Sequence, residues 1–331
     1  MQAFSPYTGQ PMLPSYERKT LLYRRKEYAY TYIGFREREI GEIFTTDESD
    51  QLCLDQITAQ YRQGHGIPFV DEIKAIRERY ELSAVAMSEI LGFWANQWRL
   101  YEQGEVPSES NGKMICSIMN PKVMLDIVEH SKESLSEKKY KKAISAIQVA
   151  ISQREQYWQT SYAIGCLYAT PQNAENGFAP LSPERLKNLL ICILNKCGEL
   201  YYTQMNKILF YIDFLSYSER AMAISGLSFR AIEFGPIPNR YERVYSAFDE
   251  IVQMPRIVQE IEVTAMITAV TADMSLFSEE EQKIINQVCD KLKGYSSRKL
   301  SELSHREDAW KNHYENKEMI PFYEAFTLSA F

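Results

Sequence analysis

Apolar positions in the first sixty residues change from strand-like to helical spacing. Residues 26–35, KEYAYTYIGF, are rich in aromatic and β-branched side chains and predict a strand. Residues 45–63 carry acidic side chains near their start, and their apolar residues from Leu52 to Tyr61 recur at helical spacing. Two glycines and a proline lie within residues 63–68, so we expect the helix to give way to a linker there.

Residues 69–128 predict a series of short helices. Ser83 is a residue type favoured at a helix N-cap, and Gly92 is the type favoured just after a helix ends. A further helix is expected to stop at Gly104, and Pro121 suits the first turn of the next one. This part of the chain is therefore predicted to be helical.

The middle of the chain predicts a long helix and a boundary. Residues 132–160 are first charged and then amphipathic, which indicates one long helix. Residues 170–183 are dense in proline, asparagine and glycine, as expected between two domains. We therefore expect four regions: a β-rich module over 1–65, a helical region over 66–131, a helical linker over 132–181 and a C-terminal domain over 182–331.

The C-terminal domain is predicted to be mostly helical with a short β insertion. Residues 204–217 predict an amphipathic helix whose apolar stripe leaves Lys207, Asp213 and Tyr217 on other faces. Residues 226–234 favour a strand, and the two prolines of residues 235–238, GPIP, predict an extended turn. The whole chain is accordingly expected to be mainly α with small β elements.

Composition indicates a globular protein without a membrane segment. The 331 residues are 45% hydrophobic and 24% charged, and no apolar run approaches the length of a membrane helix. The N-terminus lacks the basic and apolar segments of a secretory signal, so we expect a cytoplasmic protein. Its six cysteines form no C-x-x-C pair, so neither a structural zinc site nor a disulfide framework is expected. We expect no cofactor.

The net charge of −7 bears on the choice of partner. An acidic protein repels a phosphate backbone at long range, so contact with nucleic acid would depend on a local patch. An acidic surface would suit a basic protein partner. Charge alone does not decide between these two kinds of partner.

The helical region carries a set of residues typical of one DNA-binding family. Residues 69–107 contain Leu82-Ser83, Leu91-Gly92, Tyr101-Glu102, Gly104 and Pro107. With these residues the segment resembles the lambda-repressor-like (Xre) helix-turn-helix family. The resemblance implies that Trp98 is buried and that five residues lie near the exposed face and contact bases: Ala95, Asn96, Gln97, Arg99 and Leu100.

Two interpretations of this segment remain open. Asn and Gln can contact adenine, and Arg can contact guanine, so the exposed set suits operator DNA. The alternative is a helical scaffold that no longer binds DNA. Trp94 stands where a small polar residue often caps the helix, and acidic residues outnumber basic ones in this segment.

The first residues resemble a zinc module that has lost its ligands. The segments SPYTG and REREIGE place Ser5, Thr8, Glu37 and Ile40 at spacings where a metal module has cysteines. Followed by a helix and the helix-turn-helix, this order resembles the MqsA family of antitoxins. Structural zinc needs thiolate or imidazole ligands, so no metal is expected here.

Basic residues are frequent in the same module. They are Arg18, Lys19, Arg24, Arg25, Lys26, Arg36 and Arg38. They suit a solvated strand face with interspersed acids, or else a contact with a protein partner or nucleic acid.

The C-terminal domain combines several short motifs in one order. They are a helix from Lys207 to Phe214, the triplet SGL, the sequence FGPIP, and LSHRE followed by Trp310. With these motifs, residues 182–326 resemble the Panacea (SocA-like) antitoxin domain. The resemblance implies neutralisation of a toxin by direct binding, with the toxin encoded by an adjacent gene.

The motifs also indicate where a partner could bind. We expect the GPIP turn to expose a surface for the toxin that comprises Phe234, Ile237, Arg240 and Tyr241, because aromatic and arginine side chains are common interface anchors. His305 and Glu307 could form an acid–base pair, but no nucleophile or metal ligand accompanies them. We expect a structural role for both, no catalytic residues and no enzyme activity.

The sequence thus predicts the antitoxin of a type II toxin–antitoxin system. Its C-terminal domain would bind the toxin, and its helix-turn-helix would bind operator DNA as a homodimer, since two-fold operators match two-fold proteins. The alternative is a stand-alone transcriptional regulator whose C-terminal domain senses another ligand or protein. A hydrolase is a third hypothesis, but the chain lacks a metal constellation and a G-x-S-x-G motif.

Overall fold

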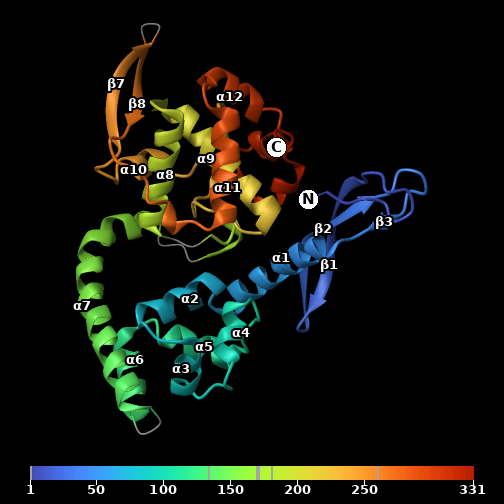
Figure 1. Cartoon of the computed structure of the whole chain (residues 1–331). Coiled ribbons are helices and arrows are strands. Elements are labelled where there is room, and N and C mark those ends of the chain that lie inside the picture. The colour runs from blue at the N-terminus through green and yellow to red at the C-terminus, as the bar shows by residue number, and fades with distance from the viewer. Residues whose placement is uncertain (1, 133–134, 169–171, 180–181, 259–260) are drawn as a thin grey trace. The chain divides into compact units, whose positions relative to one another are not determined.

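The computed structural model describes residues 2–132, 135–168, 172–179, 182–258 and 261–331. The protein is mainly helical with small antiparallel sheets, as the pattern of apolar positions predicts (Figure 1). It folds as two compact units, one formed by Met1–Ile57 with Ile164–Phe331 and the other by Thr58–Ala163. Across the described ranges, none of the helices has both the length and the apolar character needed to cross a bilayer.

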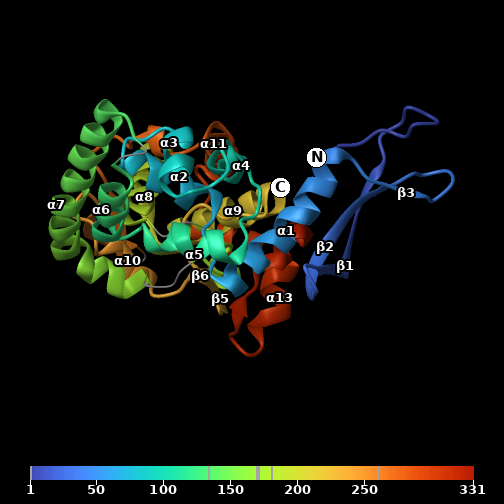
Figure 2. The ribbon, with the colours of Figure 1, turned by 90° about the horizontal axis from the view of Figure 1, so that it is seen from below.

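The N-terminal module is a three-stranded antiparallel sheet. Its strands, in the order β1-β2-β3, are β1 (Leu13–Tyr23), β2 (Lys26–Arg36) and β3 (Ile43–Phe44). This confirms the strand predicted over 26–35. The helix α1 (Asp47–His65) lies along the sheet (Figure 1, Figure 2), and the buried Gln56 side chain exchanges hydrogen bonds of 2.9 and 3.0 Å with the backbone of Thr31.

The second unit contains the predicted series of short helices and the start of a long one. They are α2 (Val70–Arg79), α3 (Ala84–Ile90), α4 (Gln97–Glu102), α5 (Glu109–Ser117), α6 (Pro121–His130) and α7 (Glu137–Tyr168). The Ser83 hydroxyl accepts a hydrogen bond from the Ala86 N–H at 3.1 Å, and Gly92 has a φ of +68°, so both ends of α3 are as predicted. Trp98 is buried, as the helix-turn-helix resemblance implies.

The C-terminal part combines helices with two three-stranded sheets. The helices are α8 (Pro183–Cys197), α9 (Tyr202–Arg220), α10 (Tyr241–Tyr245), α11 (Glu279–Leu292), α12 (Ser297–Ser304) and α13 (Asp308–Tyr314). One sheet has the order β4-β8-β7, with β4 (Leu200–Tyr201), β8 (Ile261–Ile267) and β7 (Val252–Val258). The other has the order β6-β5-β9, with β6 (Gly235–Pro238), β5 (Phe229–Ile232) and β9 (Met319–Ile320).

The helix α9 is not amphipathic, and that prediction was wrong. Every residue from Met205 to Tyr217 is buried, including Lys207 and Asp213. The cause is that α11, α12, β6 and the 3₁₀ turn Phe322–Thr327 all contact α9, so it has no solvent side over this stretch. Lys207 and Asp213 are tolerated there because each forms hydrogen bonds that compensate for its lost hydration.

Residues 170–183 pack more closely than a linker would. In the part that the structure describes, Asn173 caps the short 3₁₀ helix Ala174–Asn176, and Phe178 is buried. Gly177 has a φ of +61° and lies against Phe322. Asn173, Asn176 and Gly177 thus make a tight turn against the C-terminal core. Residues 180 and 181, where the predicted boundary falls, lie outside the described residues, and the predicted domain limits stay predictions.

Candidate functional site

The motif residues of the C-terminal domain first fix the position of the β5–β6 hairpin. Lys207, on α9, is 0% exposed, and its Nζ donates a hydrogen bond of 3.0 Å to the Pro236 carbonyl on β6. Burial lowers the pKa of Lys207 to about 7. The neutral and the charged amine can each donate to this carbonyl, so the contact holds β6 against α9.

Gly235 allows this close approach. Its φ is +95°, and a Cβ added there would lie 2.6 Å from Lys207 Cε and even closer to the Ser304 hydroxyl. A side chain at this position would meet both backbone strain and a clash. The glycine of GPIP is therefore required by the packing of the hairpin on α9 and α12.

Asp213 holds the segment that leads from α9 into β5. Its buried carboxylate accepts hydrogen bonds from the Ile224 N–H at 2.9 Å, the Ser225 N–H at 2.8 Å and the Ser225 hydroxyl. Burial raises the pKa of Asp213 to about 6, so the carboxyl is still ionised at neutral pH. The SGL triplet is thus tied to the middle of α9.

His305 and Trp310 form a stacked pair that is bonded to the end of β5. Their rings stack with centroids 4.1 Å apart, and the indole N–H of Trp310 donates to the Ile232 carbonyl at 2.8 Å. Burial, and then the nearby Lys207, lower the pKa of His305. Its Nε2 is buried and has no hydrogen-bond partner among the residues described.

Glu307 forms its side-chain hydrogen bonds with α9 and with the C-terminal residues, and not with His305. It is 1% exposed and accepts hydrogen bonds from the Tyr211 hydroxyl at 3.2 Å, the Ser329 N–H at 2.7 Å and the Ala330 N–H at 3.1 Å. It therefore ties the C-terminal residues to α9. These contacts support the structural role that we expected for Glu307.

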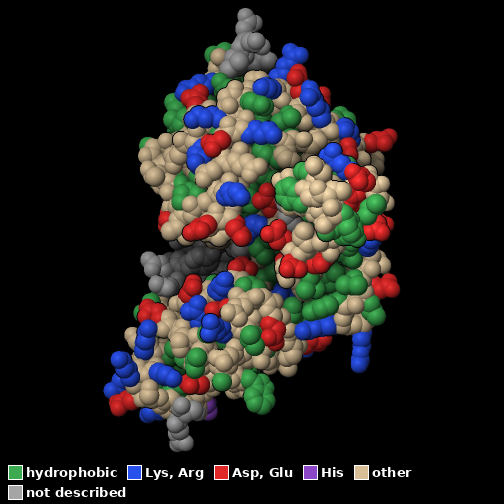
Figure 3. All heavy atoms as spheres, turned by 45° about the vertical axis from the view of Figure 1, so that its right-hand side comes forward, with side chains coloured by type: hydrophobic (Ala, Val, Ile, Leu, Met, Phe, Trp, Pro, Cys, Tyr) green, Lys and Arg blue, Asp and Glu red, His purple; other side chains and the backbone are tan. Residues whose placement is uncertain are grey.

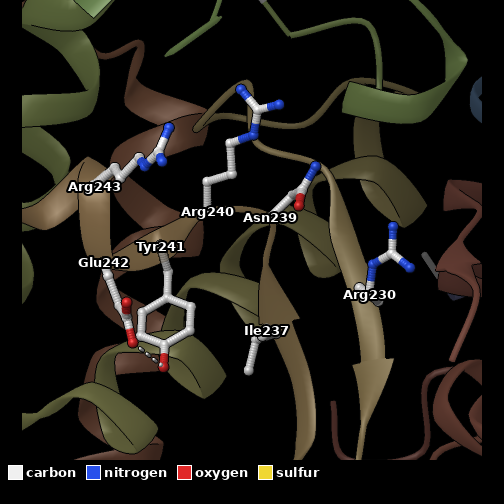
Figure 4. A pocket seen from close by; sticks show the side chains of 7 residues that line it. All are labelled: Arg230, Ile237, Asn239, Arg240, Tyr241, Glu242 and Arg243. Carbon is white, nitrogen blue, oxygen red and sulfur yellow. Dashed lines mark hydrogen bonds between the residues drawn. The ribbon is translucent and has the colours of Figure 1, made fainter.

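The hairpin presents a surface on its solvent side. Phe234, in the two-residue turn between β5 and β6, is 62% exposed, and the Ser301 hydroxyl donates to its carbonyl at 3.1 Å. Beyond β6 the chain forms a pocket of about 440 Å³ (Figure 4). The pocket is lined by Arg230, Ile237, Asn239, Arg240, Tyr241, Glu242 and Arg243.

Three of the four predicted toxin-binding residues line this pocket. They are Ile237, Arg240 and Tyr241, whereas Phe234 lies outside its lining. Arg230 joins them because it stands opposite Ile237 in the β5–β6 register, which puts both side chains on one face of the hairpin. Strand pairing is not visible in the sequence, so Arg230 was missed. Arg243 could have been found from the sequence NRYER.

Tyr241 is held in place by other aromatic rings. Its ring centroid lies 5.6 Å from that of Tyr202 and 5.9 Å from that of Tyr245. The Tyr245 hydroxyl in turn donates to the buried Asn206 at 2.6 Å. A supported aromatic residue of this kind loses little conformational freedom when a partner binds.

The predicted DNA-contacting residues lie on accessible parts of the second unit. Ala95, Asn96, Arg99 and Leu100 are exposed, and the half-buried Gln97 donates to Glu105 at 2.9 Å. The connection between α3 and α4 also leaves Trp94 85% exposed. DNA contact by these residues stays a prediction.

The N-terminal module has two tight turns, and they include the four positions that the sequence comparison aligned with the cysteines of a zinc module. The Ser5 hydroxyl accepts from the Tyr7 and Thr8 N–H groups, both at 3.2 Å, and the Glu37 carboxylate accepts from the Glu39 and Ile40 N–H groups at 2.6 and 2.9 Å. The Ile40 N–H is the main reason that the pKa of Glu37 lies below its usual value.

These four positions do not fit zinc. Ile40 offers no donor atom, and Ser5 and Thr8 offer hydroxyls instead of thiolates. Instead, Thr8 donates to Glu37 at 3.5 Å, so a hydrogen bond joins the two turns. Over the described ranges, no group of three or more His, Cys, Asp or Glu side chains is arranged to hold a metal ion.

Comparison with known proteins identifies part of the C-terminal domain. Residues 205–311 match the family described as antitoxin SocA-like, Panacea domain. This confirms the Panacea resemblance for that stretch. No curated protein and no solved structure matches the chain. The resemblance of the N-terminal half to the MqsA and Xre families stays a prediction.

Proposed function

We propose that this protein is the antitoxin of a type II toxin–antitoxin system and neutralises its toxin by direct binding through the C-terminal domain. The observation that carries the proposal is the match of residues 205–311 to an antitoxin domain. Lys207 positions the hairpin, Asp213 positions the segment that leads into it, and Glu307 positions the C-terminal residues. These structural roles agree with the proposal. We propose no catalytic activity.

The toxin is proposed to bind the solvent side of the β5–β6 hairpin. Phe234 offers an exposed aromatic ring, and Tyr241 offers one supported by neighbouring rings. Ile237 and Arg240 lie between them in the sequence and line the pocket. An apolar anchor beside an arginine is the combination that dominates many protein interfaces.

The second unit is proposed to bind operator DNA as a homodimer in the cytoplasm and so to autoregulate the operon. The exposure of Asn96 and Arg99 supports this role, since both can contact base edges. The alternative is a stand-alone regulator whose C-terminal domain binds another ligand or protein. A neighbouring gene that is not toxic would favour this alternative.

Growth rescue tests the antitoxin function. The full chain should restore growth of cells that express the toxin of the adjacent gene, and the two proteins should purify as a complex. A Phe234→Ala, Tyr241→Ala double variant should lose both effects. Ile257→Ala, a change at another exposed apolar residue of the same domain, serves as the control. Rescue without a complex would contradict direct binding.

A further inference from the structure

We propose that the pocket beside Arg240 and Arg243 receives a carboxylate-bearing segment of the partner protein. This inference rests on the proposed function, because it names the chemistry of the partner that the same surface would bind. The partner would place one or more Asp or Glu side chains against the two guanidinium groups.

The first argument is charge. In the same domain Arg185 and Arg256 pair with carboxylates, at 2.8 Å to Glu281 and 2.9 Å to Glu199. The guanidinium groups of Arg240 and Arg243 form no ion pair within the described part of the chain, although the protein has 44 acidic and 37 basic residues. Two unpaired guanidinium groups at one pocket suit a carboxylate, which they can bind through paired hydrogen bonds.

The second argument is the arrangement of the lining. Figure 4 shows the side chains of Arg240 and Arg243 on the same side of the pocket as the Asn239 amide. The one acidic residue of the lining, Glu242, lies on the opposite side, where it accepts a hydrogen bond of 3.3 Å from the Tyr241 hydroxyl. Among the described residues, Glu242 is thus bonded to Tyr241 and pairs with neither guanidinium group.

The backbone supports the same conclusion. Arg240 has a φ of +56°, a conformation that residues other than glycine rarely adopt. Asn239, just before it, is fixed by a hydrogen bond of 2.8 Å from its N–H to the Ser228 carbonyl. The arginine is therefore held in an unusual conformation at the edge of the hairpin, which is a common feature of binding sites.

A protein carboxylate fits the pocket better than a nucleic-acid phosphate. The pocket includes Ile237 and the ring of Tyr241, which suit the aliphatic part of an Asp or Glu side chain and its apolar neighbours. Glu242 and the net charge of −7 oppose a polyphosphate backbone. On the face shown in Figure 3, basic and acidic side chains are interspersed, so an extended basic surface for a nucleic acid is not visible there.

A peptide probe tests the pocket without the toxin. A fluorescein-labelled hexaglutamate peptide should bind the full chain at low salt, with fluorescence anisotropy as the measurement. The variant R240E/R243E should bind about tenfold more weakly or not at all, because it reverses both charges. The matched control K293E/R298E makes the same change in net charge at two exposed positions of the same domain and should bind as the wild type does. Circular dichroism checks that both variants are folded.

The outcomes separate this inference from the proposed function. Equal loss of peptide binding in both variants would show a general charge effect and overturn the pocket. If labelled duplex DNA, but not the peptide, lost affinity only in R240E/R243E, the pocket would bind phosphate and the inference would fail. If R240E/R243E still formed the toxin complex, the pocket inference would be wrong while the antitoxin function stood. A wild-type chain that bound the peptide but no toxin would instead contradict the antitoxin function.

Discussion

Lys207 and Gly235 share a small volume between α9 and the β5–β6 hairpin, and each depends on the other. The amine reaches the Pro236 carbonyl only because position 235 has no side chain in the way. The lysine is buried as deeply as the apolar residues around it, at the expense of most of its hydration. Lys207 and Gly235 therefore determine how the hairpin that carries the proposed partner surface packs against α9.

Substitution of Gly235 should destabilise the protein. Gly235→Ala is expected to lower the free energy of unfolding by about 2–4 kcal/mol, because a positive φ and a crowded Cβ both oppose it. Gly294→Ala is the matched control: its φ is +78°, but an added Cβ meets no atom within 4 Å. Urea unfolding of both variants measures the difference. Equal losses would show that crowding at position 235 contributes nothing.

Lys207 should make stability depend on pH. Its folded pKa of about 7 lies below the usual value of about 10.4, so the unfolded chain binds more protons between these pH values. The wild type should therefore gain stability relative to Lys207→Met as pH rises above 7, by up to about 1.4 kcal/mol per pH unit. Urea unfolding at pH 7.5, 8.25 and 9 measures the gain. Lys293→Met, at an exposed lysine, should differ from the wild type by a constant amount; a constant difference for Lys207→Met as well would contradict the argument.

At the scale of elements, side-chain oxygen atoms hold the two turns of the N-terminal module. Ser5 and Glu37 each accept two backbone N–H groups, and Thr8 bonds across to Glu37. Folding lowers the pKa of Glu37, so the ionised carboxylate stabilises the folded chain at pH values above the unfolded pKa. This stabilisation is lost as the pH falls through the folded pKa. Oxygen acceptors thus hold both turns; that thiolates stand at these positions in a related zinc module stays a prediction.

Introducing cysteines at the four positions tests the predicted MqsA resemblance. The variant S5C/T8C/E37C/I40C should bind about one zinc ion per chain, because four thiolates at this spacing suit tetrahedral zinc. Zinc released by a thiol-blocking reagent and measured with a colorimetric chelator gives the stoichiometry. The variant T8S/E37S/I40S, which has hydroxyls at all four positions, should bind none. Equal zinc in the two variants would refute the predicted alignment.

At the scale of the whole molecule, the two proposed activities belong to different parts of the chain. The candidate DNA-contacting residues belong to the unit Thr58–Ala163, and the candidate toxin surface belongs to the other unit. That other unit also includes the N-terminal module, in which the Tyr16 ring lies 5.9 Å from that of Phe326. Removing everything after residue 180 would divide this unit, so single substitutions in the full chain are the better test.

Arg99→Ala should separate the two activities. Operator binding should weaken by about 1–3 kcal/mol if Arg99 contacts a base, while growth rescue should be unchanged. Electrophoretic mobility shifts with the upstream region of the operon measure the first effect. Lys113→Ala, at another exposed basic residue of the same unit, is the control. A wild-type chain that does not bind this DNA at low salt would remove the DNA-binding proposal.

The sequence by itself determined the elements whose signals are local. The N-cap at Ser83, the glycine at position 92 and the strand over 26–35 were predicted correctly, because a cap or an alternating strand depends on residues only a few positions apart. The order of motifs from Lys207 to Trp310 was also sufficient to indicate the Panacea domain, and the family match over residues 205–311 confirms it.

Only the tertiary structure decided which polar residues are buried and which arginines line the same pocket. Periodicity placed Lys207 and Asp213 on a polar side of α9, but neighbours on every side of the helix buried both. Arg230 reached the pocket of Arg240 and Arg243 through strand pairing with Ile237. The physical reason is the same in both cases: a sequence pattern reports the polarity of a position, whereas burial and proximity depend on segments that are distant along the chain.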